Sequence, residues 1–133
     1  MSQTIMIVDD IPFVRQTIKK ILTDADYEVV GEAENGLAAI ELYKKVRPDL
    51  VTMDIVMPQM SGIDATRKMI AMDKNAKVVI ISAMEQENLM MEAISAGARE
   101  YLFKPFSASD LVKTIDRIFA GDAEFVGHTL SKL

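Results

Sequence analysis

The chain contains no cysteine and no tryptophan, and only 6% of its 133 residues are aromatic. The absence of cysteine excludes disulfide bonds, thiol catalysis and cysteine-ligated metal ions. Because aromatic rings are so scarce, the core must be built from aliphatic side chains and from the ten methionines. Half of all residues are apolar, which suffices for the core of a single domain.

The sequence also lacks an excess of basic charge and a long apolar run. Fifteen basic and twenty acidic residues give a net charge of −5, whereas nucleic acids and anionic membranes are usually bound by basic surfaces. No stretch approaches the roughly 20 apolar residues of a transmembrane helix, and the first residues, Met1-Ser2-Gln3-Thr4, lack the basic region typical of a signal peptide. We therefore expect a cytoplasmic protein that binds neither nucleic acid nor membrane.

What the sequence does contain is a regular alternation of short apolar runs with longer amphipathic stretches. The runs typical of buried strands are 5–8, 29–33, 50–53, 78–81 and 101–103. The stretches with helical spacing are 12–22, 37–46, 63–72, 85–96 and 108–120. Strict alternation of strand and helix predicts a parallel sheet with helices on both faces.

These five units are expected to form one domain over residues 1–121. Residues 122–133 contain few apolar residues, so we expect them to form a short, loosely held tail. We therefore expect no effector domain after the last helix and no direct control of transcription.

Polar side chains follow four of the five expected strands. Asp9 and Asp10 follow the first strand, and Asp54 follows the third. Ser82 follows the fourth strand and Lys104 follows the fifth. In a parallel sheet the carboxyl ends of the strands share one edge, where open α/β sheets bind their ligands. The five side chains are therefore expected to form a single site.

The expected site holds three carboxylates, which repel one another at close range unless a cation lies between them. Mg²⁺ suits such a site, because it takes oxygen ligands and shares its coordination sphere with phosphoryl groups. Zinc does not suit it, since the chain has no cysteine and its only histidine, His128, lies in the tail. The Lys104 ammonium and the Ser82 hydroxyl are suited to phosphoryl oxygens. The pattern predicts a pocket that accepts a phosphoryl group on one of its own carboxylates.

Each of these residues, taken alone, also has a purely structural explanation. The aspartates before Pro12 would cap a helix, Ser82 would cap the helix that follows it, and Lys104 would be a solvated surface charge. The coincidence of chemically complementary groups at four strand ends favours the site over these explanations.

The motifs that carry this pattern resemble those of response-regulator receiver domains. They are Ile7-Val8-Asp9-Asp10, Asp54 with Met57-Pro58 and Gly62, Ser82-Ala83, and Lys104-Pro105-Phe106. The resemblance extends from Gln3 to about Ala120 and is greatest to stand-alone chemotaxis regulators of the CheY type. It implies a flavodoxin-like, doubly wound α/β fold with a five-stranded parallel sheet in the order 2-1-3-4-5 and five helices.

The resemblance also implies a role for each acidic residue. Asp54 would be the phosphoacceptor, with a histidine kinase as the phosphoryl donor. Mg²⁺ would be held by Asp9, Asp10 and Asp54, together with the backbone carbonyl of Val56. The protein would catalyse its own phosphorylation and dephosphorylation without being a conventional enzyme.

The remaining residues of the motif would serve phosphoryl binding and switching. Ser82 and Lys104 would contact the phosphoryl group, and the Lys104–Pro105 peptide would be cis. Tyr101 would turn inward when Ser82 moves, which would change the surface formed by the fourth helix, the fifth strand and the fifth helix.

The family resemblance leaves several outputs open. A monomer that docks on the flagellar motor switch is the first expectation. A phosphorelay intermediate that serves a histidine phosphotransfer protein is the second, and an antenna that regulates a partner enzyme is the third.

Two proteins of other classes share part of the pattern. An aspartate-nucleophile phosphatase of the haloacid dehalogenase type would carry a second aspartate at position 56, where this chain has Val56. A flavodoxin-like nucleotide-binding protein would carry a glycine-rich loop after the first strand, where Asp9-Asp10-Ile11-Pro12 stands.

Overall fold

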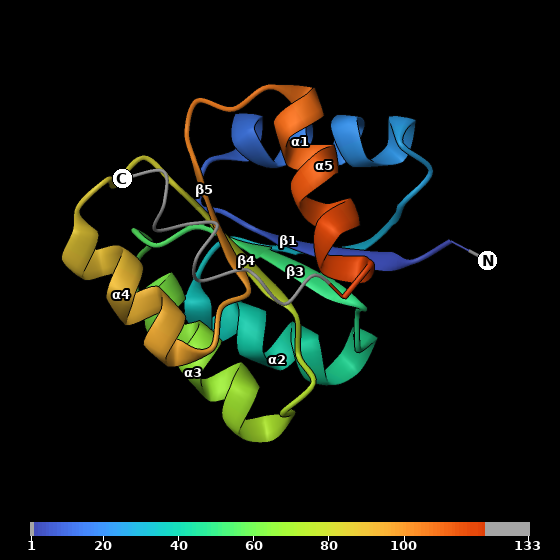
Figure 1. The fold of residues 1–133 in the computed structure, drawn as a ribbon. Helices are drawn as coiled ribbons and strands as arrows, with labels where there is room; N and C mark the ends of the chain where they lie inside the picture. The colour runs from blue at the N-terminus through green and yellow to red at the C-terminus, as the bar shows by residue number, and fades with distance from the viewer. Residues whose placement is uncertain (1, 122–133) are drawn as a thin grey trace.

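The computed structural model describes residues 2–121, in which five strands alternate with five helices (Figure 1). The strands are β1 (Thr4–Val8), β2 (Glu28–Ala33), β3 (Leu50–Met53), β4 (Val78–Ser82) and β5 (Glu100–Phe103). The helices are α1 (Pro12–Asp24), α2 (Gly36–Val46), α3 (Gly62–Met72), α4 (Glu87–Ala96) and α5 (Ala108–Phe119). The expected tail, residues 122–133, lies outside the described residues. Within residues 2–121, no helix has the length and apolar character needed to cross a bilayer.

The five strands form one parallel sheet in the order β2-β1-β3-β4-β5, which confirms the expected flavodoxin-like fold. Helices α1 and α5 cover one face of the sheet, and α2, α3 and α4 cover the other (Figure 1). The order of the strands reverses between β1 and β3, because β2 lies outside β1 while β4 and β5 continue beyond β3. This reversal opens a crevice at the carboxyl ends of β1 and β3.

Each face of the sheet has its own hydrophobic core, because alternate residues of a strand point to opposite sides. On the α1 and α5 side, the strands contribute Ile5, Ile7, Leu50, Val79 and Ile81. On the other side they contribute Met6, Val8, Val51, Met53, Val78 and Ile80. Both sets are buried, which explains why these strands are continuous apolar runs rather than alternating ones.

Polar side chains and glycine define several helix ends as the sequence indicated. The Ser61 and Ser107 hydroxyls each accept a hydrogen bond from the backbone N–H three residues later, at the starts of α3 and α5. Gly97 ends α4 with a φ of +107°, in the left-handed region that favours glycine. Helix α4 begins at Glu87, two residues later than expected, and Gln86 at its N-cap makes no side-chain capping bond.

The loop between β3 and α3 folds back tightly on the end of β3. The backbone N–H of Gly62 donates to the Ile55 carbonyl at 2.9 Å. A Cβ atom at Gly62 would lie 1.7 Å from the carbonyl oxygen of Asp54, so only glycine fits there without movement of the backbone. The loop that carries Asp54 and Val56 therefore depends on the absence of a side chain at position 62.

Replacing Gly62 by alanine is expected to reduce the free energy of unfolding by about 3 kcal/mol, since the new methyl group would collide with main-chain atoms. Denaturation in urea measures this loss. Gly121→Ala is the matched control: its φ is +81° and nothing lies within 4 Å of the added Cβ. The control should lose only about 1 kcal/mol, from the left-handed backbone alone. Equal losses in the two variants would contradict the steric explanation.

Candidate functional site

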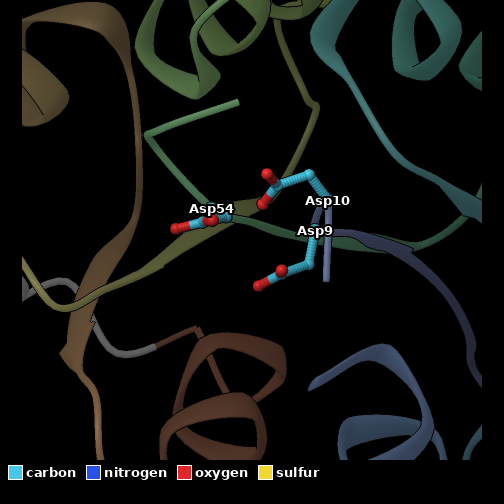
Figure 2. A group of neighbouring side chains, drawn as sticks. All are labelled: Asp9, Asp10 and Asp54. Carbon is cyan, nitrogen blue, oxygen red and sulfur yellow. The ribbon is translucent and has the colours of Figure 1, made fainter. Parts of the chain in front are cut away.

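Three aspartates converge at the carboxyl ends of β1 and β3 (Figure 2). One carboxylate oxygen from each of Asp9, Asp10 and Asp54 lies within 4.8 Å of the other two. The sheet places them there, because the backbone N–H of Asp54 donates to the Val8 carbonyl at 3.0 Å and continues the β1–β3 pairing. Asp9 and Asp54 are buried, and Asp10 is partly exposed. The expected convergence of the acidic residues is thus present in the structure.

Asp9 is held by bonds to both of its carboxylate oxygens. Oδ1 accepts from the Ile11 backbone N–H at 2.9 Å, and Oδ2 accepts from the Lys104 ammonium at 2.8 Å. Ile11 occupies the N-cap position of α1, where no side chain provides a capping bond. Neither aspartate therefore caps the helix, and the helix-cap explanation for this pair is wrong.

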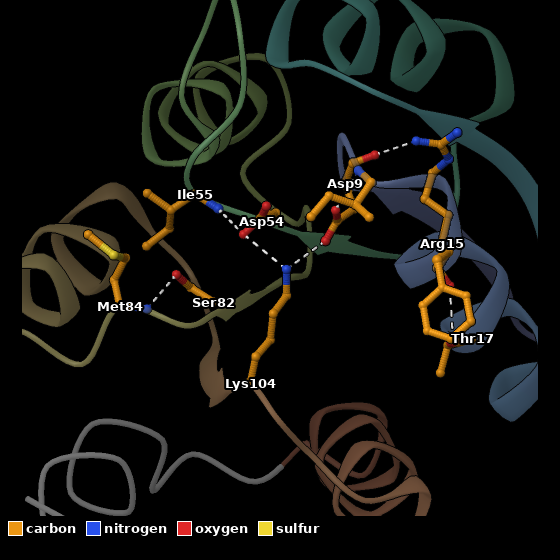
Figure 3. Close-up of polar contacts among 10 residues, drawn as sticks. Asp9, Arg15, Thr17, Asp54, Ile55, Ser82, Met84 and Lys104 are labelled. Atoms are coloured by element: carbon orange, nitrogen blue, oxygen red, sulfur yellow. Dashed lines mark hydrogen bonds and ion pairs between the residues drawn. The ribbon is translucent and has the colours of Figure 1, made fainter.

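Lys104 enters the acidic pocket from the end of β5 (Figure 3). Its Nζ atom lies 2.8 Å from Asp9 and 3.5 Å from Asp54, and its side chain is only 17% exposed. Its backbone N–H donates to the Ser82 carbonyl at 2.9 Å, and the peptide bond to Pro105 is cis, as expected. The lysine is therefore a partly buried counter-ion rather than a solvated surface charge.

Ser82 lies at the end of β4, close to the acidic pocket, and is buried. Its hydroxyl accepts from the Met84 backbone N–H at 3.0 Å (Figure 3). Because α4 begins only at Glu87, Ser82 does not cap that helix. The same Met84 accepts, through its carbonyl, a hydrogen bond from the Tyr101 hydroxyl. One residue thus joins the site to the buried Tyr101, whose pKa is raised by its burial.

Val56 lies on the loop after β3, two residues beyond Asp54, and the residue is 62% exposed. A haloacid dehalogenase phosphatase would need a general acid at this place, and an exposed valine cannot donate a proton. The backbone carbonyl of Val56 belongs to the same loop as Asp54.

The electrostatics of the pocket depend on burial. Removal from water raises the pKa of Asp54 to about 6, against the opposing effect of the Lys104 ammonium, and the nearby Asp9 carboxylate adds to the rise. A group that holds a proton this strongly also gains from a nearby metal cation. The ligands on offer are carboxylate oxygens, so the site suits a hard divalent ion.

The sequence patterns did not identify Arg15, which lies on α1 next to this loop. Its Nη1 atom donates to the Asp9 carbonyl at 2.6 Å (Figure 3). Its Nε atom donates to Glu32 on β2 at 3.2 Å. The only signal in the sequence was a pair of opposite charges, seventeen residues apart, on a helix and a strand. No spacing rule connects such a pair.

A model of the response regulator receiver domain family matches residues 5–116 of this chain. The chain belongs to that family. Among its curated relatives, the chemotaxis protein CheY of Thermotoga maritima is 48% identical over 118 residues, which cover 89% of this chain and 98% of that protein. The CheY protein of Bacillus subtilis is 46% identical over 117 residues, which cover 88% of this chain and 98% of that protein.

Solved structures of receiver domains have the same fold. CheY in the CheX–CheY–BeF₃–Mg²⁺ complex from Borrelia burgdorferi superimposes with a TM-score of 0.86 at 31% identity. The match covers 88% of this chain and 89% of that one. The protein is thus a CheY-like receiver domain of a two-component response regulator, with an acidic pocket that could hold a metal ion.

The Asp54→Asn variant of the receiver domain is expected to be more stable than the wild type in EDTA. Because folding raises the pKa of Asp54, its contribution to stability is complete below the unfolded-state pKa and is lost as the pH rises through about 6. Denaturation in urea at about pH 7.5 should show a gain of about 1–2 kcal/mol, allowing for solvent screening.

At about pH 4 the difference between wild type and Asp54→Asn should shrink, because the wild-type carboxyl group is then largely neutral in the folded state and about half protonated in the unfolded state. Asp64→Asn, which changes an exposed carboxylate on α3, is the matched control. A stabilisation of Asp54→Asn that does not vary with pH would contradict the burial argument.

Proposed function

We propose that this receiver domain is a signalling switch that accepts a phosphoryl group on Asp54 from the phosphohistidine of a histidine kinase. The observation that carries the proposal is the Lys104 ammonium, which lies within ion-pair distance of a buried carboxylate in a cluster of three. A purely structural aspartate would need neither the other two carboxylates nor the lysine.

The contacts of the three aspartates distinguish their roles. Both oxygens of Asp9 are already hydrogen-bonded, to Ile11 and to Lys104. Asp54 uses Oδ1 for the Ile55 backbone N–H, and Oδ2 has no hydrogen-bond partner within residues 2–121. That free oxygen leaves Asp54, unlike Asp9, able to act as the nucleophile. The lower exposure of Asp54 relative to Asp10 also keeps competing water away from the product.

Asp9, Asp10, Asp54 and the Val56 carbonyl would hold Mg²⁺, whose charge would neutralise the oxygens of the incoming phosphoryl group. In the transfer, an Asp54 oxygen forms a bond to phosphorus while the phosphorus–nitrogen bond of the phosphohistidine breaks. The imidazole nitrogen keeps the electron pair of the broken bond. Lys104 remains within reach of the transferred group and offsets its negative charge.

The new phosphoryl group would act on the rest of the domain through Ser82. It adds about −1.5 to −2 charge and new acceptor oxygens, which compete for the Ser82 hydroxyl. Movement of Ser82 breaks its bond to the Met84 N–H, and the Met84 carbonyl is the acceptor of the Tyr101 hydroxyl. Tyr101 and the α4, β5 and α5 surface around it then change together, which is the switch.

The comparisons support a role in chemotaxis, and docking on the flagellar motor switch is the output that we propose for it. Several relatives are CheY proteins, and one structural neighbour was solved with a protein partner, CheX. A phosphorelay step to a histidine phosphotransfer protein is the second candidate, because the same acyl phosphate could be handed on. In either role the protein acts in the cytoplasm as a monomer and turns over only its own phosphoryl group.

Incubation with acetyl phosphate and Mg²⁺ should add one phosphoryl group per chain, and intact-protein mass spectrometry measures it. Asp54→Asn should acquire none, because the nucleophilic carboxylate is gone. EDTA should abolish the addition in the wild type. Asp64→Asn, which alters an exposed carboxylate on α3, should be phosphorylated like the wild type.

Undiminished phosphorylation of Asp54→Asn would refute the assignment of the phosphoacceptor. Steady hydrolysis of a generic phosphate ester, without accumulation of phosphoprotein, would favour the phosphatase class instead.

Activation with beryllofluoride and Mg²⁺ should strengthen binding to the true output partner, because the fluoride complex imitates the phosphoryl group. Calorimetric titrations against a purified motor-switch protein and against a histidine phosphotransfer protein compare the two outputs. Tyr101→Ala should lose the activation-dependent gain while it still takes up beryllofluoride. A gain with the phosphotransfer protein alone would replace the chemotaxis assignment by the phosphorelay.

A further inference from the structure

The main chain of Asp9 is held on both sides of the residue. Its N–H donates to the Ala33 carbonyl of β2 at 3.1 Å, and its carbonyl accepts from Arg15 Nη1 at 2.6 Å (Figure 3). That carbonyl belongs to the peptide unit that joins Asp9 to Asp10. The orientation of this peptide is therefore determined by a side chain of α1, beyond the pairing of the sheet.

Arg15 is itself fixed between a helix and a strand. Its Nε atom lies 3.2 Å from Glu32 Oε1, and Lys19 Nζ lies 3.5 Å from the other oxygen of the same carboxylate. The Arg15 side chain is only 16% exposed, and Glu32 pairs with Ile7 of β1 across the sheet. We call Arg15 together with Glu32 the β1-loop clamp, since the pair joins α1 and β2 to the loop after β1.

Asp10 is the acidic residue that this clamp can influence most. Its carboxylate has no hydrogen bond or ion pair within the described part of the chain, whereas those of Asp9 and Asp54 each have two. Without contacts of its own, the Asp10 side chain takes its direction from the backbone. The backbone at that point is the peptide unit held by Arg15.

We infer that Arg15 is a positioning residue, which aims the Asp10 carboxylate at the metal site through its bond to the Asp9 carbonyl. The inference rests on the proposed function, in which Asp10 binds Mg²⁺. Arginine suits this role because its planar guanidinium can bond a carbonyl and a carboxylate at once, whereas a lysine ammonium lacks that fixed fork. In other metalloproteins, groups that hydrogen-bond to the metal-binding residues orient those residues, and the loss of such a group typically weakens metal binding.

If Arg15 acted on the metal site only through its charge, its removal would change the Mg²⁺ affinity in the opposite direction from that expected for a positioning residue. Arg15 is a cation near an acidic pocket, so its removal should raise the affinity for Mg²⁺ if only charge mattered. Positioning requires that its removal lower the affinity. The sign of the change in Mg²⁺ affinity therefore separates positioning from a purely electrostatic effect.

The test is calorimetric titration of the full chain with Mg²⁺ alone, for wild type, Arg15→Met, Arg15→Lys and Lys19→Met. Arg15→Met should raise the dissociation constant for Mg²⁺ about tenfold. The rate of phosphorylation is recorded only as a second readout. Arg15→Lys, which keeps one donor for the Asp9 carbonyl, should recover part of the affinity. Lys19→Met removes the neighbouring cation of Glu32 and should bind Mg²⁺ as tightly as the wild type or more tightly.

Two further measurements on the same variants complete the experiment: the free energy of unfolding and the rate of amide hydrogen exchange. Urea denaturation in EDTA should show that Arg15→Lys remains folded, so this variant carries the test if Arg15→Met does not fold. Amide hydrogen exchange at Asp10 and Ile11 should accelerate in the Arg15 variants and not in Lys19→Met.

Two results would overturn the inference and leave the proposed function standing. One is unchanged or tighter Mg²⁺ binding by the Arg15 variants, and the other is an equal loss in Lys19→Met. Failure of the wild type to bind Mg²⁺ would overturn the proposed function and the inference together.

Discussion

The ion pairs of Lys104 with Asp9 and Asp54 are the interaction on which the site depends. Two buried carboxylates and a third beside them would be costly at this edge of the sheet without a compensating cation. The lysine reaches them from β5, on the far side of β4, so the pairing also connects one edge strand to the centre of the sheet. The geometry of the pocket and the integrity of the sheet are therefore coupled.

Parallel pairing brings these residues together from distant parts of the sequence. Asp9 and Lys104 are 95 residues apart and meet at 2.8 Å, because β1 and β5 end at the same edge. The helices contribute differently on the two faces. Helix α1 supplies Arg15, which stabilises the loop after β1, whereas α3 approaches the end of β3 closely enough to require glycine at position 62.

Much of the fold could be predicted from the sequence, since buried parallel strands are recognisable apolar runs and the helices have clear caps at Ser61, Ser107 and Gly97. The order of the strands came from the family resemblance, because apolar runs do not encode which strand lies beside which. The strand-end residues of the site were predictable as well, because each of them directly follows one of these apolar runs. Arg15 and the late start of α4 were not, because both depend on tertiary contacts that leave no periodic signal.

The connection between Ser82 and Tyr101 consists of main-chain atoms of one residue. Met84 offers its N–H to the serine and its carbonyl to the tyrosine, and its own side chain contributes to neither bond. Substitution at position 84 can therefore replace the side chain while this main-chain link persists. The choice of side chain and the preservation of the link are separate matters, so communication between Ser82 and Tyr101 does not depend on the identity of residue 84 as long as its backbone N–H is kept.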